Sequence, residues 1–308
     1  MSGFYLGIID RAPIATASIV TGSAVAGYPI QNVCSTYLGH QGQVSNAGSV
    51  VIKLDLGSAP STSSDVDYAV NYFSLHNHNL DGCIVTLKYD DAGVYAGAST
   101  AAFYSLTNYA GFPGMMLSFA ATSHRYWYLS IGSGVGSVPA TVKIGHLGLG
   151  YGVDIGHPLR QSSQMSSRPA NWGGDGNGAP PRLDQPDRSF SGLFRGMSAL
   201  TDAAATNFTK ANGVNYVAYN PIVRAMNEAF QISLSSGAGT RTGLCCGSGR
   251  PMPYHRGDQL WQLSPAGRPA GYGTIQIDLN PFWARDRSAM QVTITDVRPY
   301  DPLIKPGG

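Results

Sequence analysis

The sequence predicts a mainly β protein whose N-terminal half is an antiparallel β-sandwich. Short stretches of alternating apolar and polar residues recur through this half, as in strands with one buried face. Glycine is abundant, at 39 of 308 residues, and it separates these stretches as turn residues do. No helical period of useful length occurs before residue 190. Turn-separated strands at this spacing are typical of an antiparallel sandwich or barrel.

Five strands are predicted in the first half. In the first of them, Val50, Ile52, Leu54 and Leu56 alternate with other residues and therefore face one way. A hairpin turn is expected at 90–93, and the glycine-rich runs 132–137 and 148–152 are interpreted as turns. The predicted strands are Ser49–Leu56, Tyr68–Leu75, Cys83–Tyr89, Arg125–Ile131 and Thr141–Leu147.

The second half mixes helical and strand patterns. A short helix is predicted over 198–212, and Asn220 followed by Pro221 suits the start of a second one. Four strands are then predicted, at 231–234, 259–263, 274–279 and 290–297. We expect a second β-rich α+β domain with one or two short helices.

A stretch of different composition separates the halves. Residues 158–186 are dominated by Gly, Pro, Ser and Asn and predict a linker or arm, because such residues offer little to bury. The predicted division is a sandwich over 1–155, a linker over 156–189 and an assembly domain over 190–308.

Composition excludes several classes of protein. Twenty basic and 18 acidic residues give a formal net charge of +2, so no nucleic-acid partner is indicated. No apolar run approaches the ~20 residues that span a bilayer, so membrane insertion is not expected. The N-terminus lacks the pattern of a signal peptide, which predicts synthesis in a cytoplasm. Cys34 and Cys83 are expected to be buried free thiols.

Several motifs in the first 150 residues resemble one known family. The quoted segments are YPIQNVCSTYLGHQG (28–42), VVIKLDLGSA (50–59), YAVNYFSLHNHNLDG (68–82), IVTLKYDDAG (84–93) and RYWYLSI (125–131). Together they resemble the discoidin-like, galactose-binding-like jelly roll in the version found in structural proteins of tailed bacteriophages. The loop that is acidic and bears tryptophan in that pattern is the uncharged STYLGHQGQ here. The second half looks like the β-rich cores of phage tail-tip and baseplate proteins.

The most suggestive cluster for a metal is His76-Asn77-His78-Asn79. His76 and His78 alternate on a strand and so are able to present two imidazoles to one ion. The interpretation we favour is a structural turn over 77–81, since no third ligand is near in the sequence. No metal and no cofactor are predicted.

A second cluster, His124 to Tyr128, has the composition of a sugar platform. Arg125 and Trp127 are its candidate ligand contacts, and Tyr104, Tyr109 and Phe112 lie in aromatic-rich segments nearby. The favoured alternative is core packing, because large aromatic residues usually pack first. Asp65, Asp67, Asp90 and Asp91 raise the question of paired carboxylates or calcium, but 90–91 is more simply a turn.

These observations predict a non-enzymatic structural component of a tailed-phage virion, in the tail tip, baseplate or a connector. Its partners would be other virion proteins and copies of itself in a homo-oligomeric ring. The alternative is a carbohydrate- or receptor-binding module of the virion that binds a host surface glycan, and an envelope-polymer hydrolase ranks third because the chain has a single glutamate, Glu228. Candidate subunit contacts are Trp172, Arg241, Arg250, Arg256 and Arg268.

Overall fold

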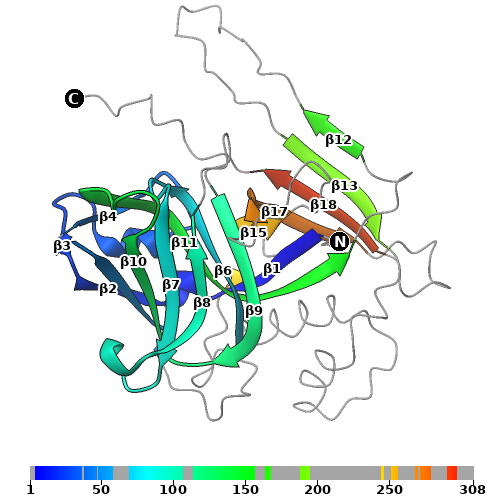
Figure 1. Cartoon of the computed structure of the whole chain (residues 1–308). Helices are drawn as coiled ribbons and strands as arrows, with labels where there is room; N and C mark the ends of the chain where they lie inside the picture. The colour runs from blue at the N-terminus through cyan, green and yellow to red at the C-terminus, as the bar shows by residue number, and fades with distance from the viewer. Residues whose placement is uncertain are drawn as a thin grey trace, which may run out of the picture.

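The computed structural model describes residues 4–36, 38–46, 48–57, 69–106, 114–156, 164–167, 188–194, 244–245, 251–255, 268–269, 271–278 and 290–296. Within these ranges the chain forms two antiparallel β-sheets with short 3-10 turns, which confirms the predicted mainly β class (Figure 1). The same ranges contain no helix long and apolar enough to cross a bilayer. The helices predicted at 198–212 and after Asn220, and the strands predicted at 231–234 and 259–263, lie outside these ranges.

The smaller sheet has five strands in the order β2-β5-β10-β7-β8. Along β5 the residues Val50, Ile52 and Leu54 are buried in the core, as their alternation predicts, while Lys53 and Asp55 face the other way and are partly exposed. The five strands are β2 (Thr16–Thr21), β5 (Val50–Asp55), β7 (Cys83–Asp90), β8 (Ser99–Ser105) and β10 (Tyr126–Ser133).

The larger sheet has thirteen strands and draws on both halves of the chain. Its main path runs β12-β13-β18-β17-β15-β1-β11-β6-β9-β16, and β3, β4 and β14 pair beside this path. From the first half come β1 (Phe4–Asp10), β3 (Ser23–Ala24), β4 (Gly42–Ser45), β6 (Ala69–His78), β9 (Gly114–Ser123) and β11 (Thr141–Gly156). From the rest come β12 (Gln164–Ser167), β13 (Arg188–Phe194), β14 (Leu244–Cys245), β15 (Pro251–His255), β16 (Arg268–Pro269), β17 (Gly271–Asp278) and β18 (Met290–Asp296).

The two sheets pack face to face over one hydrophobic core. Phe73, Leu75 and Leu147 project into it from the large sheet, and Leu87 and Leu129 project from the small one. Because alternate residues of a strand point to opposite faces, the remaining side chains of β6 and β11 lie on the far side of the large sheet. The first half of the chain is therefore a β-sandwich, as the sequence predicts.

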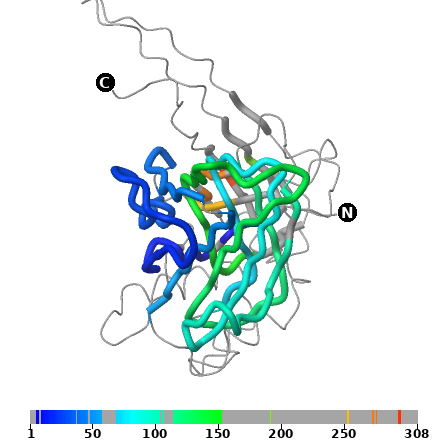
Figure 2. The backbone as a smooth tube through the Cα atoms, turned by 60° about the vertical axis from the view of Figure 1, so that its left-hand side comes forward, coloured from blue at the N-terminus to red at the C-terminus, as the bar shows by residue number. Residues whose placement is uncertain are grey.

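Part of the large sheet closes on itself. β16 pairs with β9 through Arg268 opposite Met116, and one residue later the chain enters β17, which is linked through β15, β1, β11 and β6 back to β9. β9 also contacts β15 and β17 directly. Figure 1 shows the blue strand β1 next to the green strand β11, with β15 between β1 and the orange strand β17, and Figure 2 shows the same neighbourhood from another side. This closed ring of strands is the second structural unit that the functional argument needs.

The glycine-rich run 148–152 is not the turn that its composition predicts. It lies inside β11, where Gly148, Gly150 and Gly152 alternate with larger residues on one face of the strand. A Cβ on Gly150 would collide with the carbonyl oxygen of Ile9, so glycine permits β1 and β11 to approach closely. The prediction failed because glycine marks close backbone approach as well as turns.

The predicted linker also contains regular structure. β12 lies inside 156–189 and pairs with β13, and both belong to the large sheet. Since strands of both halves share this sheet, hydrogen bonding crosses the predicted boundary near residue 155. The division into separate domains stays a prediction.

Candidate functional site

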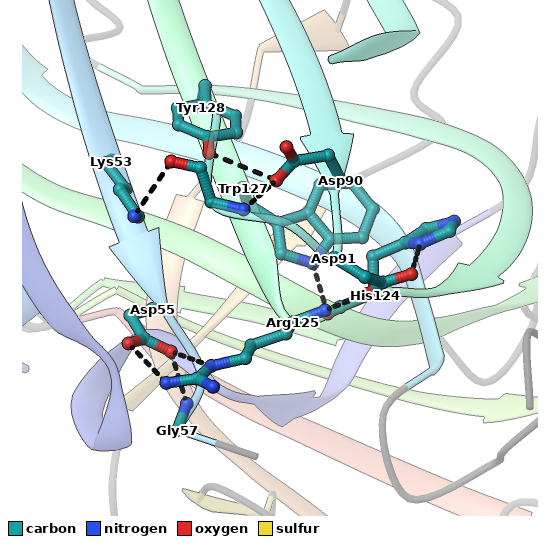
Figure 3. Close-up of polar contacts among 10 residues, drawn as sticks. Lys53, Asp55, Gly57, Asp90, Asp91, His124, Arg125, Trp127 and Tyr128 are labelled. Atoms are coloured by element: carbon teal, nitrogen blue, oxygen red, sulfur yellow. Dashed lines mark hydrogen bonds and ion pairs between the residues drawn. The ribbon is translucent and has the colours of Figure 1, made fainter. Parts of the chain in front are cut away.

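Charged side chains from three neighbouring strands meet at one end of the small sheet. Asp55 ends β5 and Asp90 ends β7, and both are in register with Tyr126 at the start of β10. His124 and Arg125 form the short connection that leads from β9 into β10. We call the side chains Asp55, Asp90, Asp91, His124 and Arg125 the outer polar rim (Figure 3).

Arg125 and Asp55 form a two-point ion pair in this rim. Arg125 Nε donates to Asp55 Oδ1 at 2.9 Å and Nη2 donates to Oδ2 at 3.1 Å, while the backbone N–H of Gly57 adds a bond of 2.8 Å to Oδ1. Partial burial acts to raise the pKa of Asp55, but these hydrogen bonds and the charges of Arg125 and Lys53 outweigh it and hold the pKa below its ordinary value. The side chains are 32% and 27% exposed, so the pair is open to solvent.

Asp91 and His124 form the second pair. The imidazole Nδ1 of His124 lies 2.9 Å from Asp91 Oδ2, and Asp91 Oδ1 accepts the backbone N–H of Arg125 at 2.9 Å. The His124 ring stacks on Tyr89 with centroids 3.9 Å apart, which fixes its plane. Burial opposes ionisation of Asp91, yet the bonds from Arg125 and His124 lower its pKa. Asp91 is nevertheless 49% exposed and can accept further hydrogen bonds.

Asp90 has a structural part in the same region. Its Oδ1 accepts the Tyr128 hydroxyl at 3.1 Å and the N–H of Gly93 at 3.0 Å, and its Oδ2 accepts the N–H of Val94 at 2.8 Å. The carboxylate thus closes the turn after β7, which confirms the turn predicted at 90–93. Lys53 donates to the carbonyl of Gly93 at 3.3 Å and braces the turn from β5.

The rim offers both donors and acceptors to a ligand. Arg125 has five N–H donors, of which two bind Asp55, so three have no partner among the described residues. Asp91 supplies acceptor capacity beside them. This arrangement suits a small polar molecule with neighbouring hydroxyl groups, because each hydroxyl both donates and accepts.

Trp127 is not a ligand contact. Its ring is fully buried in the core between the sheets, and its Nε1 donates to the His124 carbonyl at 3.0 Å. The core-packing alternative is therefore confirmed for Trp127. Arg125 does not share its face as strand alternation predicts, because Arg125 lies in the bend before β10 and its guanidinium carbon lies 4.6 Å from the Tyr126 ring centre.

His76 and His78 do not form a two-histidine metal site. His78 Nδ1 accepts the backbone N–H of Leu80 at 3.2 Å, whereas His76 faces the interior of the closed ring of strands. Asn77 between them has a φ of 51°, so the backbone departs from regular strand geometry there, one residue before β6 ends. Among the described residues no three His, Cys, Asp or Glu side chains gather as a metal would need.

The other predicted contacts fall on less described parts of the chain. Tyr104 lies in β8 opposite Val85, and Arg268 lies in β16. Tyr109, Phe112, Trp172, Arg241, Arg250, Arg256, Asp65 and Asp67 lie outside the described ranges, and their predicted roles stay predictions. Cys34 and Cys83 are buried and free, as predicted.

The sequence argument missed Asp55 as a rim residue, and it named His124 only as part of the 124–128 cluster. Asp55 sits about seventy positions from Arg125, and only the pairing of β5 with β10 brings the two together. The available signal is an aspartate within one residue of the end of a predicted strand, and it is shared by Asp55 and Asp90.

No protein-family model and no curated protein matches this chain. Among solved structures, the chain is similar to chitosan-binding module 1 of a chitosanase/glucanase from Paenibacillus sp. IK-5, with 14% identity over 46% of this chain and 97% of the module and a TM-score of 0.36. It is similar to CpGH89CBM32-5 from Clostridium perfringens in complex with GalNAc-β-1,3-galactose, with 13% identity, 46% and 99% coverage and a TM-score of 0.36. It is also similar to the CBM32 of AlyQ in complex with 4,5-unsaturated mannuronic acid, with 19% identity, 47% and 96% coverage and a TM-score of 0.32.

Proposed function

We propose that this chain is a carbohydrate-binding protein and that the outer polar rim contacts the sugar hydroxyls. The observation that carries this proposal is the position of two partly exposed, hydrogen-bonded pairs, Arg125–Asp55 and His124–Asp91, at the same end of adjacent strands. The glycan-binding alternative from the sequence thus becomes the first choice.

The chemistry of the rim matches a polyol better than an ion. The ion pair with Asp55 fixes the orientation of the planar Arg125 guanidinium, so its remaining N–H donors point in fixed directions. Such a fork suits a ligand with two neighbouring oxygen atoms. Asp91 can accept a hydrogen bond from a hydroxyl of the same ligand. Because the rim holds both hydrogen-bond donors and acceptors, a hydroxyl of a neutral ligand can bond to both kinds of group.

The ionisation of the rim carboxylates favours binding over hydrolysis. Glycoside hydrolysis by the usual pair of carboxyl groups needs one carboxylic acid whose pKa is raised so that it holds a proton. In the rim the pKa values of Asp55 and Asp91 are both lowered, so both are ionised at neutral pH. We therefore propose a rim that holds its ligand and leaves it intact.

A glycan array followed by isothermal titration calorimetry tests this proposal. We expect wild type to bind a defined set of glycans, and Arg125→Lys to bind them about tenfold or more weakly, because lysine keeps the charge but loses the planar fork. Asp91→Asn should weaken binding in the same direction. The control is Lys143→Gln, an exposed change on β11 in the other sheet, which should bind as wild type does.

Two results would contradict the proposal. If the folded wild-type chain binds no glycan on the array, the proposal of carbohydrate binding is wrong. Glycan binding that survives Arg125→Lys and Asp91→Asn unchanged would keep carbohydrate binding but move it away from the rim.

A second candidate is the assembly role in a tailed-phage particle, which the resemblance of the first half implies. One observation favours a contact between chains: β8 is an edge strand of the small sheet, Phe103 on it is 62% exposed, and nearby Val94 is 57% exposed. Analytical ultracentrifugation of wild type and Phe103→Ser tests it. A wild-type oligomer that dissociates in the variant would support assembly through β8, and a monomeric wild type at high concentration would contradict it.

A further inference from the structure

The closed ring of strands has a polar interior that the proposed function does not use. On the face of β6 away from the sandwich core lie Ser74 and His76, and opposite them on β11 lie Gly148 and His146. Tyr272 reaches the same place from β17. We call Asp10, Ser74, His76, His146 and Tyr272 the inner polar cluster, and each of its side chains is 0–3% exposed.

The members of the inner polar cluster lie close together. The ring centroids of His76 and Tyr272 are 5.1 Å apart, those of His146 and Tyr272 are 5.0 Å apart, and the two imidazoles are 6.2 Å apart. Ser74 Oγ occupies the space that a Cβ on Gly148 would fill, and that point lies 3.4 Å from His146 Nε2. Side chains from β6, β11 and β17 therefore place polar atoms close together in one buried region.

Asp10 and His146 satisfy each other. His146 Nε2 lies 2.8 Å from Asp10 Oδ2, and His146 Nδ1 lies 2.6 Å from the carbonyl oxygen of Ser35. Asp10 Oδ1 also accepts the N–H groups of Ala12 and Leu149, at 3.0 and 3.3 Å. Both ring nitrogens of His146 therefore face oxygen atoms, and neither is left for a further ligand.

Three other atoms of the cluster have no such partner. Ser74 Oγ, His76 Nε2 and Tyr272 Oη are buried and make no hydrogen bond within the described part of the protein. Buried polar groups in folded proteins are nearly always hydrogen-bonded, and each exception is costly. Three such unpaired atoms in one place indicate a shared ligand that bonds to all of them.

The donors and acceptors of the inner polar cluster indicate which ligand fits. A cation is disfavoured because both Asp10 oxygens already have hydrogen-bond partners and, among the described residues, no three His, Cys, Asp or Glu side chains are placed to hold a metal ion. A hydroxyl, a phenol and a neutral imidazole can each donate or accept, and water complements all three because it does both. Burial and the neighbouring His146 and His78 hold the pKa of His76 well below its ordinary value, so His76 is neutral.

We propose that Ser74 Oγ, His76 Nε2 and Tyr272 Oη form a binding site for structural water inside the closed ring of strands. The bound water links β6 to β17 and so joins the first half of the chain to strands from its second half. This site is independent of the proposed carbohydrate-binding rim, which lies on the small sheet.

Removal of a hydroxyl group tests the proposal, because a bound water and an unpaired hydroxyl predict Tm changes of different sign. If the hydroxyl of Tyr272 binds water, Tyr272→Phe loses a hydrogen bond and its Tm should fall by about 2–4 °C. If the hydroxyl is truly without a partner, Tyr272→Phe removes a buried penalty and its Tm should stay constant or rise. Tyr72→Phe is the matched control, because Tyr72 Oη donates directly to the Ile9 carbonyl at 3.1 Å and its loss calibrates the effect of one buried hydroxyl.

A double-mutant cycle and a direct probe complete the test. Ser74 and Tyr272 do not bond each other, so a shared water predicts that Ser74→Ala and Tyr272→Phe together lower Tm by less than the sum of the single shifts. In wild type, nuclear Overhauser effects from long-lived water to the protons of His76 and Tyr272 should be observed. A Tyr272→Phe variant with an unchanged or higher Tm would overturn the proposal, as would a lower Tm without any water signal at these residues.

Discussion

His78 makes the fold sensitive to acid, and the size of the effect follows from its surroundings. Its Nδ1 accepts the backbone N–H of Leu80, a bond that only the neutral imidazole can make. Burial, partly offset by the negative charge of Asp81, lowers the pKa of His78 from 6.5 to about 4. In the unfolded chain the same group titrates near ~6.5. Between these two pH values the unfolded state binds the extra proton and the folded state does not.

The sign and the magnitude follow from this difference. Stability is unaffected above pH ~6.5 and falls as the pH drops through the interval toward pH ~4, because protons then favour the unfolded state. At pH 5 the linkage relation gives a loss of about 2 kcal/mol in the free energy of unfolding relative to pH 7. The His78 side chain is partly exposed, so this value is an upper limit for its own contribution. His76, whose pKa is also lowered, adds to the loss in the same direction.

Urea unfolding at pH 7, 6 and 5, followed by tryptophan fluorescence, measures this effect. The informative variant is His78→Asn, because the amide oxygen can accept the same bond from Leu80 without titrating. We expect the difference in unfolding free energy between pH 7 and pH 5 to shrink by up to about 2 kcal/mol in this variant. Val135→Ser, a change at a side chain that is 97% exposed and does not titrate, is the control and should keep the wild-type pH dependence. A His78→Asn chain that loses as much stability as wild type at pH 5 would refute the reasoning.

Three further predictions concern packing and reactivity. Trp127→Ala empties a fully buried site in the sandwich core and should lower the unfolding free energy by about 3–5 kcal/mol in urea titrations. Gly150→Ala places a Cβ against the Ile9 carbonyl oxygen and should destabilise the chain by about 1–3 kcal/mol, with the loss of amide protection concentrated in β1. Burial and the nearby Asp10 raise the pKa of Cys34 to about 12, so iodoacetamide at pH 8 should leave Cys34 unmodified in native protein and modify it in urea, as read by peptide mass mapping.

The strands that the sequence predicted best have one buried face. In β5 the alternation of Val50, Ile52 and Leu54 is visible because solvent permits Lys53 and Asp55 on the other face. The ends of β5, β7 and β10 were consequently predicted to within about two residues. A local pattern suffices where only one side of a strand meets the core.

Strands that are buried on both faces were predicted only in part. β11 was predicted to end at Leu147 but continues to Gly156, since His146, Gly148 and Gly150 face the closed ring of strands while Leu147 and Leu149 face the sandwich core. Neither the ring nor its polar contents can be read from a window of the sequence, because Tyr272 lies more than a hundred residues away. Composition therefore indicated a turn where packing requires a strand.

The distribution of charge decides what the low charge content means. Charged residues are only 12% of the chain, and together with the strand-rich halves, the predicted arm and the family resemblance this composition suggested a surface that other chains cover. Yet Asp55, Asp91 and Arg125, with His124, gather at one exposed end of the small sheet. Exposed ion pairs contribute little to stability, so folding does not explain why scarce charges are concentrated there. A surface that recognises a polar ligand does explain it, and for that reason the rim argues for binding more strongly than the average composition argues for assembly.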